Sequence, residues 1–214
     1  MKFNVDQIAM LAAPLDRANV STRVQGSATV SYIAGWHAIA EANRIFGFDA
    51  WTRELRDLTM VVDTMRLAKD GKTQNHYVAY RATVRVTVGT IVREGVGYGE
   101  GIDKFHGQAH ESAIKEAETD AMKRALMTFG NPFGLALYDK TQSNVADASQ
   151  IQAQTDKQVK DAAAAYLKSL SALKTEIDEF RGIAGAHWAT VALDGQGVGI
   201  SSIQDLIAYA RSNA

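Results

Sequence analysis

Residues 76–98, HYVAYRATVRVTVGTIVREGVGY, decide the fold of this chain. Across residues 78–88 every second residue is apolar, and the residues in between are mostly polar. A period of two predicts a strand with one buried face and one polar face. Gly89 and Thr90 then turn the chain into a second strand at residues 91–98. The stretch therefore predicts an antiparallel hairpin.

The hairpin belongs to a larger pattern. Its two-residue loop sets a register in which Arg85 faces Glu94. Upstream, residues 51–67 are a candidate for a long strand, and Asp70 with Gly71 is a strong turn signal. Downstream, within residues 108–129, apolar residues recur every four positions at Ala117, Ala121, Ala125 and Phe129, which predicts a long helix with one apolar face. We therefore expect an α+β fold in which an antiparallel β-meander packs against the long helix as a β-β-β-α core.

The remaining segments suggest how the chain is divided. Shorter elements precede the meander, with helices expected at residues 5–12 and 36–46 and strands at 20–24 and 29–33. The polar segment 141–155 is expected to be a linker between a domain of residues 1–140 and a small helical tail. The tail, residues 156–214, is expected to begin with a helix up to residue 180. It is expected to end with a helix at residues 203–211, which the pair Ser201 and Ser202 can cap.

The composition limits the classes of protein that fit. Apolar residues make up 46% of the 214 residues and charged residues 22%, which is normal for a globular protein. No apolar run approaches the ~18 residues of a membrane helix. Cysteine is absent, which excludes disulfides, thiolate metal ligands and a cysteine nucleophile. The formal net charge is −1, so binding of a polyanion would need locally concentrated positive charge.

Two motifs invite a chemical interpretation. Residues 95–101 have glycine at every second position, but a phosphate-binding loop would need its third glycine where Glu100 stands. A flexible exit from the strand is the better interpretation.

His106 and His110 could place two imidazoles one helical turn apart beside Glu111, as a zinc site requires. No third ligand is evident, and an exposed first helical turn explains the same residues. Without a serine–histidine–carboxylate or paired-carboxylate pattern, we expect no enzyme.

The exposed face of the long helix is more informative. Lys123 and Arg124 project together near its C-terminal end. They suit contact with nucleic acid, although cations here also favour the helix dipole and Asp120 can pair with Arg124. Glu118 projects into the apolar arc, where a carboxylate without a partner is costly. We therefore expect a partner for it, with a second subunit as one source.

Three blocks of the chain resemble the N-terminal domain of the Rad52 family of single-strand annealing proteins. They are residues 32–51 (YIAGWHAIAEANRIFGFDAW), residues 77–99 and residues 113–140 (AIKEAETDAMKRALMTFGNPFGLALYDK). The third block matches a long family pattern, A-x-K-E-A-x-T-D-x-x-K-R-A-L-x-x-F-G-N-x-x-G, and closes on Asp139 and Lys140 as the pattern does. The resemblance covers about residues 18–140, and the order and spacing of the blocks also fit.

The resemblance implies that the β-β-β-α core assembles into a closed homo-oligomeric ring. Single-stranded DNA would lie in a basic groove around that ring. It would anneal there to a complementary strand in homologous recombination and double-strand-break repair, without ATP, a metal or another cofactor. The positions that match the family's inner groove are Arg23, Tyr32, Lys123, Arg124 and Lys140, and Lys104 matches a second, outer DNA site.

Three positions depart from the family pattern. Met127, Asn75 and Asn144 stand where the family has basic residues. The inner groove is therefore matched in part, and the outer site is matched by Lys104 alone. Two alternatives stay open for the function. One is an RNA or double-stranded-DNA binding module with a similar sheet-helix core, and the other is a ring-forming scaffold that has lost DNA binding.

The expected partners and compartment follow from the same resemblance. We expect single-stranded DNA, further copies of this chain, and a single-strand-binding protein that docks on the C-terminal region, with no membrane. The compact form and the lack of a nuclear-type basic run favour the cytoplasm of a bacterium or a phage-infected cell.

Overall fold

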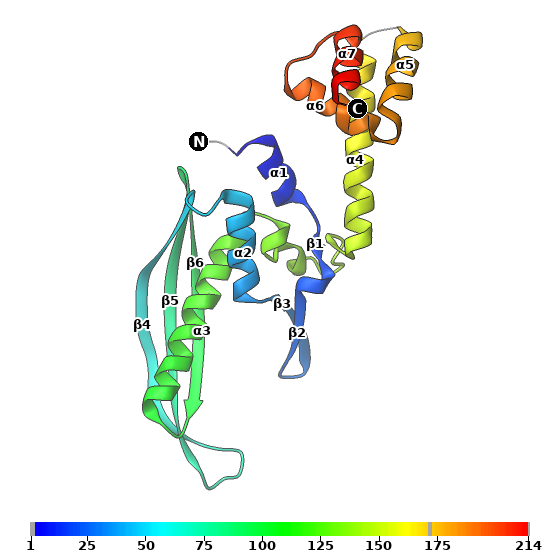
Figure 1. Ribbon diagram of the computed structural model, residues 1–214. Coiled ribbons are helices and arrows are strands. Elements are labelled where there is room, and N and C mark those ends of the chain that lie inside the picture. The colour runs from blue at the N-terminus through cyan, green and yellow to red at the C-terminus, as the bar shows by residue number, and fades with distance from the viewer. Residues whose placement is uncertain (1–2, 171–172, 214) are drawn as a thin grey trace. The chain divides into compact units, whose positions relative to one another are not determined.

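The structure is a computed structural model of the chain, in which residues 3–170 and 173–213 are described (Figure 1). The chain divides into two compact units, Met1–Ala148 and Ser149–Ala214, and each has its own buried core. The boundary lies inside the segment expected to be a linker. Much of that segment has regular structure, since it contains β7 (Val145–Ala146) and the start of α4 (Ala148–Ser169).

The first unit is built on an antiparallel sheet of three long strands (Figure 1). β4 (Trp51–Leu67), β5 (Gln74–Val88) and β6 (Ile91–Asp103) lie side by side in chain order. The register of β5 with β6 pairs Arg85 with Glu94, and the two side chains form an ion pair of 2.8 Å. The expected α+β fold with an antiparallel meander is therefore confirmed.

The loop between β4 and β5 contains the predicted turn at Asp70 and Gly71. The Asp70 carboxylate accepts the Thr73 hydroxyl at 2.6 Å and the N–H groups of Thr73 and Lys72 at 2.9 Å each. These hydrogen bonds, the one from the Thr73 side chain foremost, lower the pKa of Asp70 to about 2. Gly71 has φ of 68°, a left-handed conformation that glycine adopts without steric cost.

The glycine run of β6 is a packing surface. We expected the strand to end at Tyr98 in a flexible exit, but it continues to Asp103. Every second residue from Gly95 to Gly101 is a glycine that faces α3 (His106–Met127). A Cβ built on Gly97 would lie only 2.2 Å from the Ala121 nitrogen. The flexible-exit prediction is wrong because these glycines let the helix backbone approach the strand.

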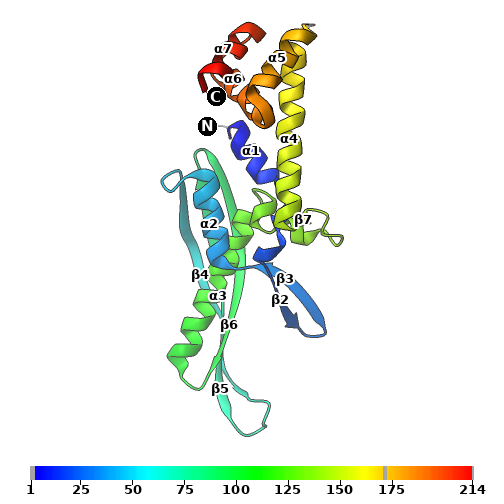
Figure 2. The same ribbon diagram turned by 45° about the vertical axis from the view of Figure 1, so that its right-hand side comes forward.

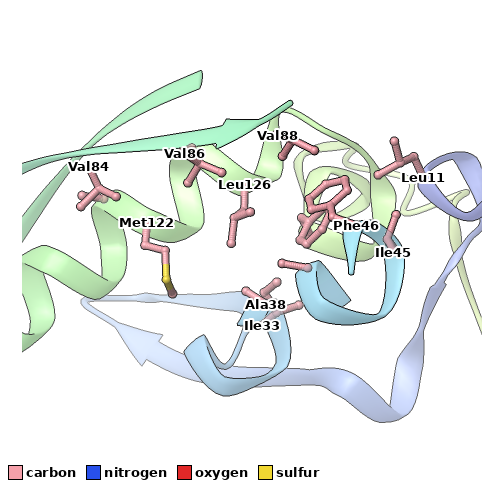
Figure 3. Close-up of a cluster of buried hydrophobic side chains, with 14 of the residues drawn as sticks. Leu11, Ile33, Ala38, Ile45, Phe46, Val84, Val86, Val88, Met122 and Leu126 are labelled. Atoms are coloured by element: carbon pink, nitrogen blue, oxygen red, sulfur yellow. The ribbon is translucent and has the colours of Figure 1, made fainter. Parts of the chain in front are cut away.

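The long helix α3 supplies the matching small residues. Its buried alanines recur every four positions, as expected, at Ala109, Ala113, Ala117, Ala121 and Ala125. Toward the end of α3 the apolar side chains become larger, and there α1 (Val5–Ala12) and α2 (Gly35–Phe46) complete the core. Figure 3 shows this cluster, with β5 and α3 contributing Val84, Val86, Val88, Met122 and Leu126, and the earlier segments contributing Leu11, Ile33, Ala38, Ile45 and Phe46.

Several short elements surround the C-terminal half of α3. β2 (Val20–Gln25) and β3 (Ala28–Ile33) form a separate hairpin (Figure 2). β1 (Leu15–Asp16) pairs in parallel with β7 and leads through η1 (Arg17–Asn19) into β2. After α3 the chain continues through η2 (Asn131–Phe133) and η3 (Leu135–Tyr138). Beyond the end of α3, the backbone of Gly130 lies so close to α1 that a Cβ there would be 2.1 Å from the Leu11 oxygen, and Pro132 lies in the first turn of η2.

The second unit is helical, as expected. After α4 it contains α5 (Lys174–Ala184), η4 (Gly185–His187), α6 (Trp188–Gly197) and α7 (Ile203–Asn213). The continuous helix expected at residues 156–180 is wrong, because α4 ends at Ser169. Ser202 caps α7 as predicted, accepting the N–H of Asp205 at 3.1 Å. Within the described ranges, no helix combines the length and apolar character needed to cross a membrane.

Candidate nucleic-acid interface

A groove of about 960 Å³ lies in the first unit, between the β2–β3 hairpin, the exposed face of α3, and the η2 and η3 turns. We refer to it as the groove. Four of the six predicted DNA-binding residues line it: Arg23, Tyr32, Lys123 and Arg124. The structure thus brings together side chains that are about a hundred residues apart in the sequence.

The helical period of α3 places the polar residues of this surface. The buried alanines occupy one side of the helix, so Glu116, Asp120, Lys123, Arg124 and Met127 share the opposite side and line the groove. The facing wall is the β2–β3 hairpin. There, strand alternation and pairing bring Arg23 and Tyr32 to the same groove.

Tyr32 is the centre of the cationic cluster. The guanidinium carbon of Arg23 lies 5.8 Å from the centroid of the Tyr32 ring, and the Lys123 ammonium lies 5.7 Å from it. Cations at this distance are attracted by the ring quadrupole. Burial lowers the pKa of the Lys123 ammonium, and the charges of Arg23 and Arg124 lower it further, against the opposing effect of Asp120 and Glu116.

Two carboxylates of α3 balance this positive charge. Glu116 lies 3.8 Å from the Arg23 guanidinium, and Asp120 pairs with Arg124 at 2.9 Å. The Asp120 pair was anticipated from the i,i+4 spacing, and its hydrogen bond raises the pKa of Arg124. The partnership of Glu116 with Arg23 was not anticipated. The only signal for it was that Glu116 precedes Asp120 by one helical turn on the same face.

The same carboxylates also cover the free edge of β6. Glu116 accepts the backbone N–H of Glu100 at 3.0 Å, and Asp120 faces the N–H of Tyr98 at 3.4 Å. An edge strand needs such partners because its outward N–H groups are otherwise unpaired. Glu116 and Asp120 therefore serve both the sheet edge and the cations of the groove.

The other two predicted site residues do not line the groove. Lys104 is exposed just beyond β6, before α3 begins, and Lys140 is exposed just beyond η3. The 1.5 Å rise per helical residue puts the start of α3 roughly 25 Å from Lys123. Lys104 therefore lies apart from the groove, and its role in an outer site stays a prediction. The position of Lys140 outside the groove differs from the expectation for an inner-groove residue.

Other groove residues escaped the sequence reasoning. Lys115, Tyr98, Phe133 and Tyr138 line the groove as well. Lys115 lies two helical turns before Lys123 on the same face, so helical spacing could have suggested it. The contributions of Phe133 and Tyr138 depend on the path of η2 and η3 and have no local signature.

Glu118, the carboxylate on the apolar side of α3, has its partner within the same chain. Its Oε1 lies 2.9 Å from Nη2 of Arg53 on β4, and both side chains are partly exposed. A second subunit is therefore not required to compensate this charge. The sequence did not point to Arg53 because the sheet, and not local spacing, brings it to α3.

The comparisons with known proteins agree with the three sequence blocks. The chain is 44% identical over 142 residues to "DNA repair and recombination protein RAD52" of Eremothecium gossypii, covering 64% of this chain and 31% of that protein. It is 42% identical over 120 residues to "DNA repair and recombination protein rad22" of Schizosaccharomyces pombe, covering 54% and 24%. The Saccharomyces cerevisiae RAD52 protein is 40% identical over 125 residues, covering 56% and 25%.

These relatives are fungal, so the bacterial or phage origin expected from the sequence is not borne out. This chain spans about a third or less of their lengths. The family model described as "Rad52/22 family double-strand break repair protein" matches residues 5–157, which include the sheet, α3 and every residue of the groove. The chain belongs to the Rad52/22 family of double-strand break repair proteins.

Proposed function

We propose that this protein anneals complementary DNA strands in homologous recombination and double-strand-break repair, binding single-stranded DNA in the groove without a catalytic step or ATP. The observation that carries the proposal is the convergence of Arg23, Lys123 and Arg124 around Tyr32. Cations beside an aromatic ring suit a flexible strand, because they hold phosphates and offer a stacking face without reading sequence.

The charge of the groove explains why several subunits would be needed. Its lining holds four cations and three carboxylates: Arg23, Lys115, Lys123 and Arg124 against Glu100, Glu116 and Asp120. One chain therefore contributes a net charge of about +1 to the strand. Phosphate contacts add along a strand that crosses several identical sites, so a weak single site becomes a strong collective one.

Exposed apolar side chains on the sheet support assembly into a homo-oligomeric ring. β4 exposes Leu55, Met60 and Leu67, and β6 exposes Val96 and Ile102, each by about half of its surface. β4 and β6 are also the two edges of the three-stranded sheet. Exposed apolar side chains of this kind favour burial against another chain, and a closed ring would cover them.

A variant of α3 tests the groove directly. Lys123→Ala with Arg124→Ala should weaken binding of a single-stranded oligonucleotide and slow annealing of complementary strands, while helicity is kept because alanine favours helix. The plot of log affinity against log salt should become shallower by ~0.7 for each phosphate that the variant no longer neutralises. The matched control is Lys157→Ala with Lys160→Ala, which removes the same charge from α4 and should change neither quantity.

Asp120→Asn supplies the opposite change. It removes the charge that holds Arg124 but keeps an oxygen for the N–H of Tyr98. Single-strand affinity should rise, most clearly at low salt. If neither change affects binding, the groove is not the DNA site and the scaffold alternative gains support. Preference for RNA or for duplex DNA over single-stranded DNA would favour the alternative of another nucleic-acid module.

The second unit remains our proposed docking region for a single-strand-binding protein. The supporting feature is a hollow of about 520 Å³ between α4 and α5, where three cations, Lys168, Lys174 and Arg181, outnumber one carboxylate, Asp178, among apolar side chains. An acidic peptide segment is the partner chemistry that this hollow fits. Titration of the full chain with such a protein, with and without Lys168→Glu and Arg181→Glu, tests the proposal. Unchanged affinity in that variant would reject this surface.

A further inference from the structure

Three side chains with metal-ligand chemistry meet at the N-terminal end of α3, away from the groove. His106 and His110 lie one turn apart on α3, and Asp63 comes from β4. Nε2 of His106 lies 2.9 Å from Oδ2 of Asp63 and 3.0 Å from Nε2 of His110. Nε2 of His110 lies 3.6 Å from the same Asp63 oxygen. The three atoms form a small triangle.

Hydrogen bonds cannot satisfy all three atoms of this triangle while both imidazoles are neutral. A neutral imidazole carries one N–H, and an ionised carboxylate only accepts. A single N–H on Nε2 of His106 leaves lone pairs of His110 and Asp63 directed at each other across 3.6 Å, and every other arrangement of the protons places a mismatched pair at 2.9 or 3.0 Å. A cation inside the triangle would satisfy all three atoms at once, because each would direct a lone pair at it.

The dimensions fit a tetrahedral divalent ion. Zinc–nitrogen and zinc–oxygen bonds of about 2.0–2.1 Å place neighbouring ligand atoms about 3.3 Å apart. The observed separations of 2.9, 3.0 and 3.6 Å lie close to that value on either side. Two imidazoles with one carboxylate are a donor set typical of Zn²⁺ and of other late first-row metals. All three side chains are partly exposed, which leaves solvent access to a fourth position.

A fourth side chain, that of Tyr80, contacts His110 on the side of its ring opposite the triangle. The Tyr80 hydroxyl lies 2.9 Å from Nδ1 of His110, the ring nitrogen that points away from the triangle. Partners of this kind fix the orientation of a metal-binding histidine and the nitrogen it presents. Glu111, which the sequence placed beside the histidines, instead pairs with Lys115 and accepts a hydrogen bond from Gln108.

We propose that Asp63, His106 and His110 bind one divalent ion of the Zn²⁺ class, which fastens β4 to the first turns of α3. The third ligand, which sequence spacing did not supply, comes from a strand more than forty residues upstream. The ion would hold the end of the sheet next to Lys104 and is separate from DNA binding in the groove.

Calorimetric titration of the untagged full chain with ZnCl₂ tests the proposal. We expect one site per chain, and Co²⁺ should give the strong visible absorption of a tetrahedral site. Saturating Zn²⁺ should raise Tm by about 5 °C or more at a hundredfold excess over Kd. Asp63→Asn and His106→Gln should each lower affinity by more than the roughly tenfold loss expected for Tyr80→Phe.

His187→Gln, which changes an exposed histidine in η4, is the matched control and should bind Zn²⁺ as the wild type does. Circular dichroism of Asp63→Asn and His106→Gln establishes that each variant is folded before its affinity is compared. Absence of binding at micromolar Zn²⁺ would overturn the proposal. Binding that survives both substitutions would overturn it too, because the ion would then be held elsewhere.

Discussion

At the scale of single residues, the Lys123 ammonium is partly buried and lies close to other charged side chains. Burial and the nearby Arg23 and Arg124 disfavour its ammonium form, so its pKa lies below the ordinary lysine value. A phosphate in the groove would favour the charged form and raise that pKa again. At a pH where Lys123 of the DNA-free protein is partly deprotonated, binding of DNA should therefore be accompanied by uptake of a proton. The affinity for DNA should then fall as the pH rises.

This linkage gives a pH test of the groove. In wild-type protein, single-strand affinity should decline with rising pH before an ordinary lysine would begin to titrate. Lys123→Arg should flatten the decline, because the arginine guanidinium stays protonated over the same range. Fluorescence anisotropy with a labelled oligonucleotide at constant ionic strength measures both profiles. Parallel profiles for the two proteins would show that Lys123 does not contact the strand.

A second residue-scale prediction separates the groove from the outer site. Met127 lines the groove beside Lys123 and Arg124, so Met127→Arg adds a guanidinium within reach of the same backbone. Single-strand affinity should rise several-fold at low salt.

Lys104→Ala, at the other end of α3, should lower single-strand affinity much less than Arg124→Ala does, because salt screens the attraction between a single exposed cation and a phosphate. The reverse ranking in the same binding assay would place the strand on the outer surface.

At the scale of elements, the contact of β6 with α3 is the least adaptable part of the first unit. Four glycines of the strand face the backbone of the helix. The interface therefore consists of main chain against main chain, with alanine methyl groups filling the space between. Close-packed interiors of this kind cannot absorb an added side chain without moving an entire element.

Gly97→Ala should show this intolerance. The new Cβ would lie 2.2 Å from the Ala121 nitrogen and 2.4 Å from the Ala117 oxygen, so β6 and α3 must separate. We expect a loss of about 3 kcal/mol in the free energy of unfolding, measured by urea denaturation. Gly107→Ala is the matched control on α3, since its Cβ meets no atom within 4 Å. It should be neutral or stabilising by up to ~1 kcal/mol.

At the scale of the whole molecule, the two units have separate cores, and the family match ends at residue 157. The first unit nevertheless extends beyond the last sequence block, which ends at Lys140. Val145 and Ala146 are buried and pair with Leu15 and Asp16, so β7 joins residues far apart in the sequence. The boundary that matters for truncation is therefore Ala148.

Deletion of residues 149–214 should leave the proposed oligomer and the single-strand affinity unchanged, because the groove and the sheet edges lie in the first unit. Deletion of residues 145–214 should also remove β7, uncover Leu15 and lower Tm by several degrees. Light scattering and thermal unfolding of the two truncated proteins provide the comparison. Equal stability of the two truncated proteins would show that β7 contributes nothing to the stability of the first unit. Loss of the oligomer in the protein that ends at Ala148 would place the assembly surface in the helical unit.

The sequence by itself determined the features that depend on neighbours along the chain. The period of two predicted the strands, and the alanine repeat predicted α3. The two-residue loop predicted the pairing of Arg85 with Glu94. Tertiary structure decided what distant segments do to one another. Glycine at every second position has the same local pattern in a flexible exit and in a packed strand, and only the approach of α3 distinguishes them. Likewise, Asp63 becomes a neighbour of His106 because the sheet and the helix pack together, and no spacing along the chain encodes that distance.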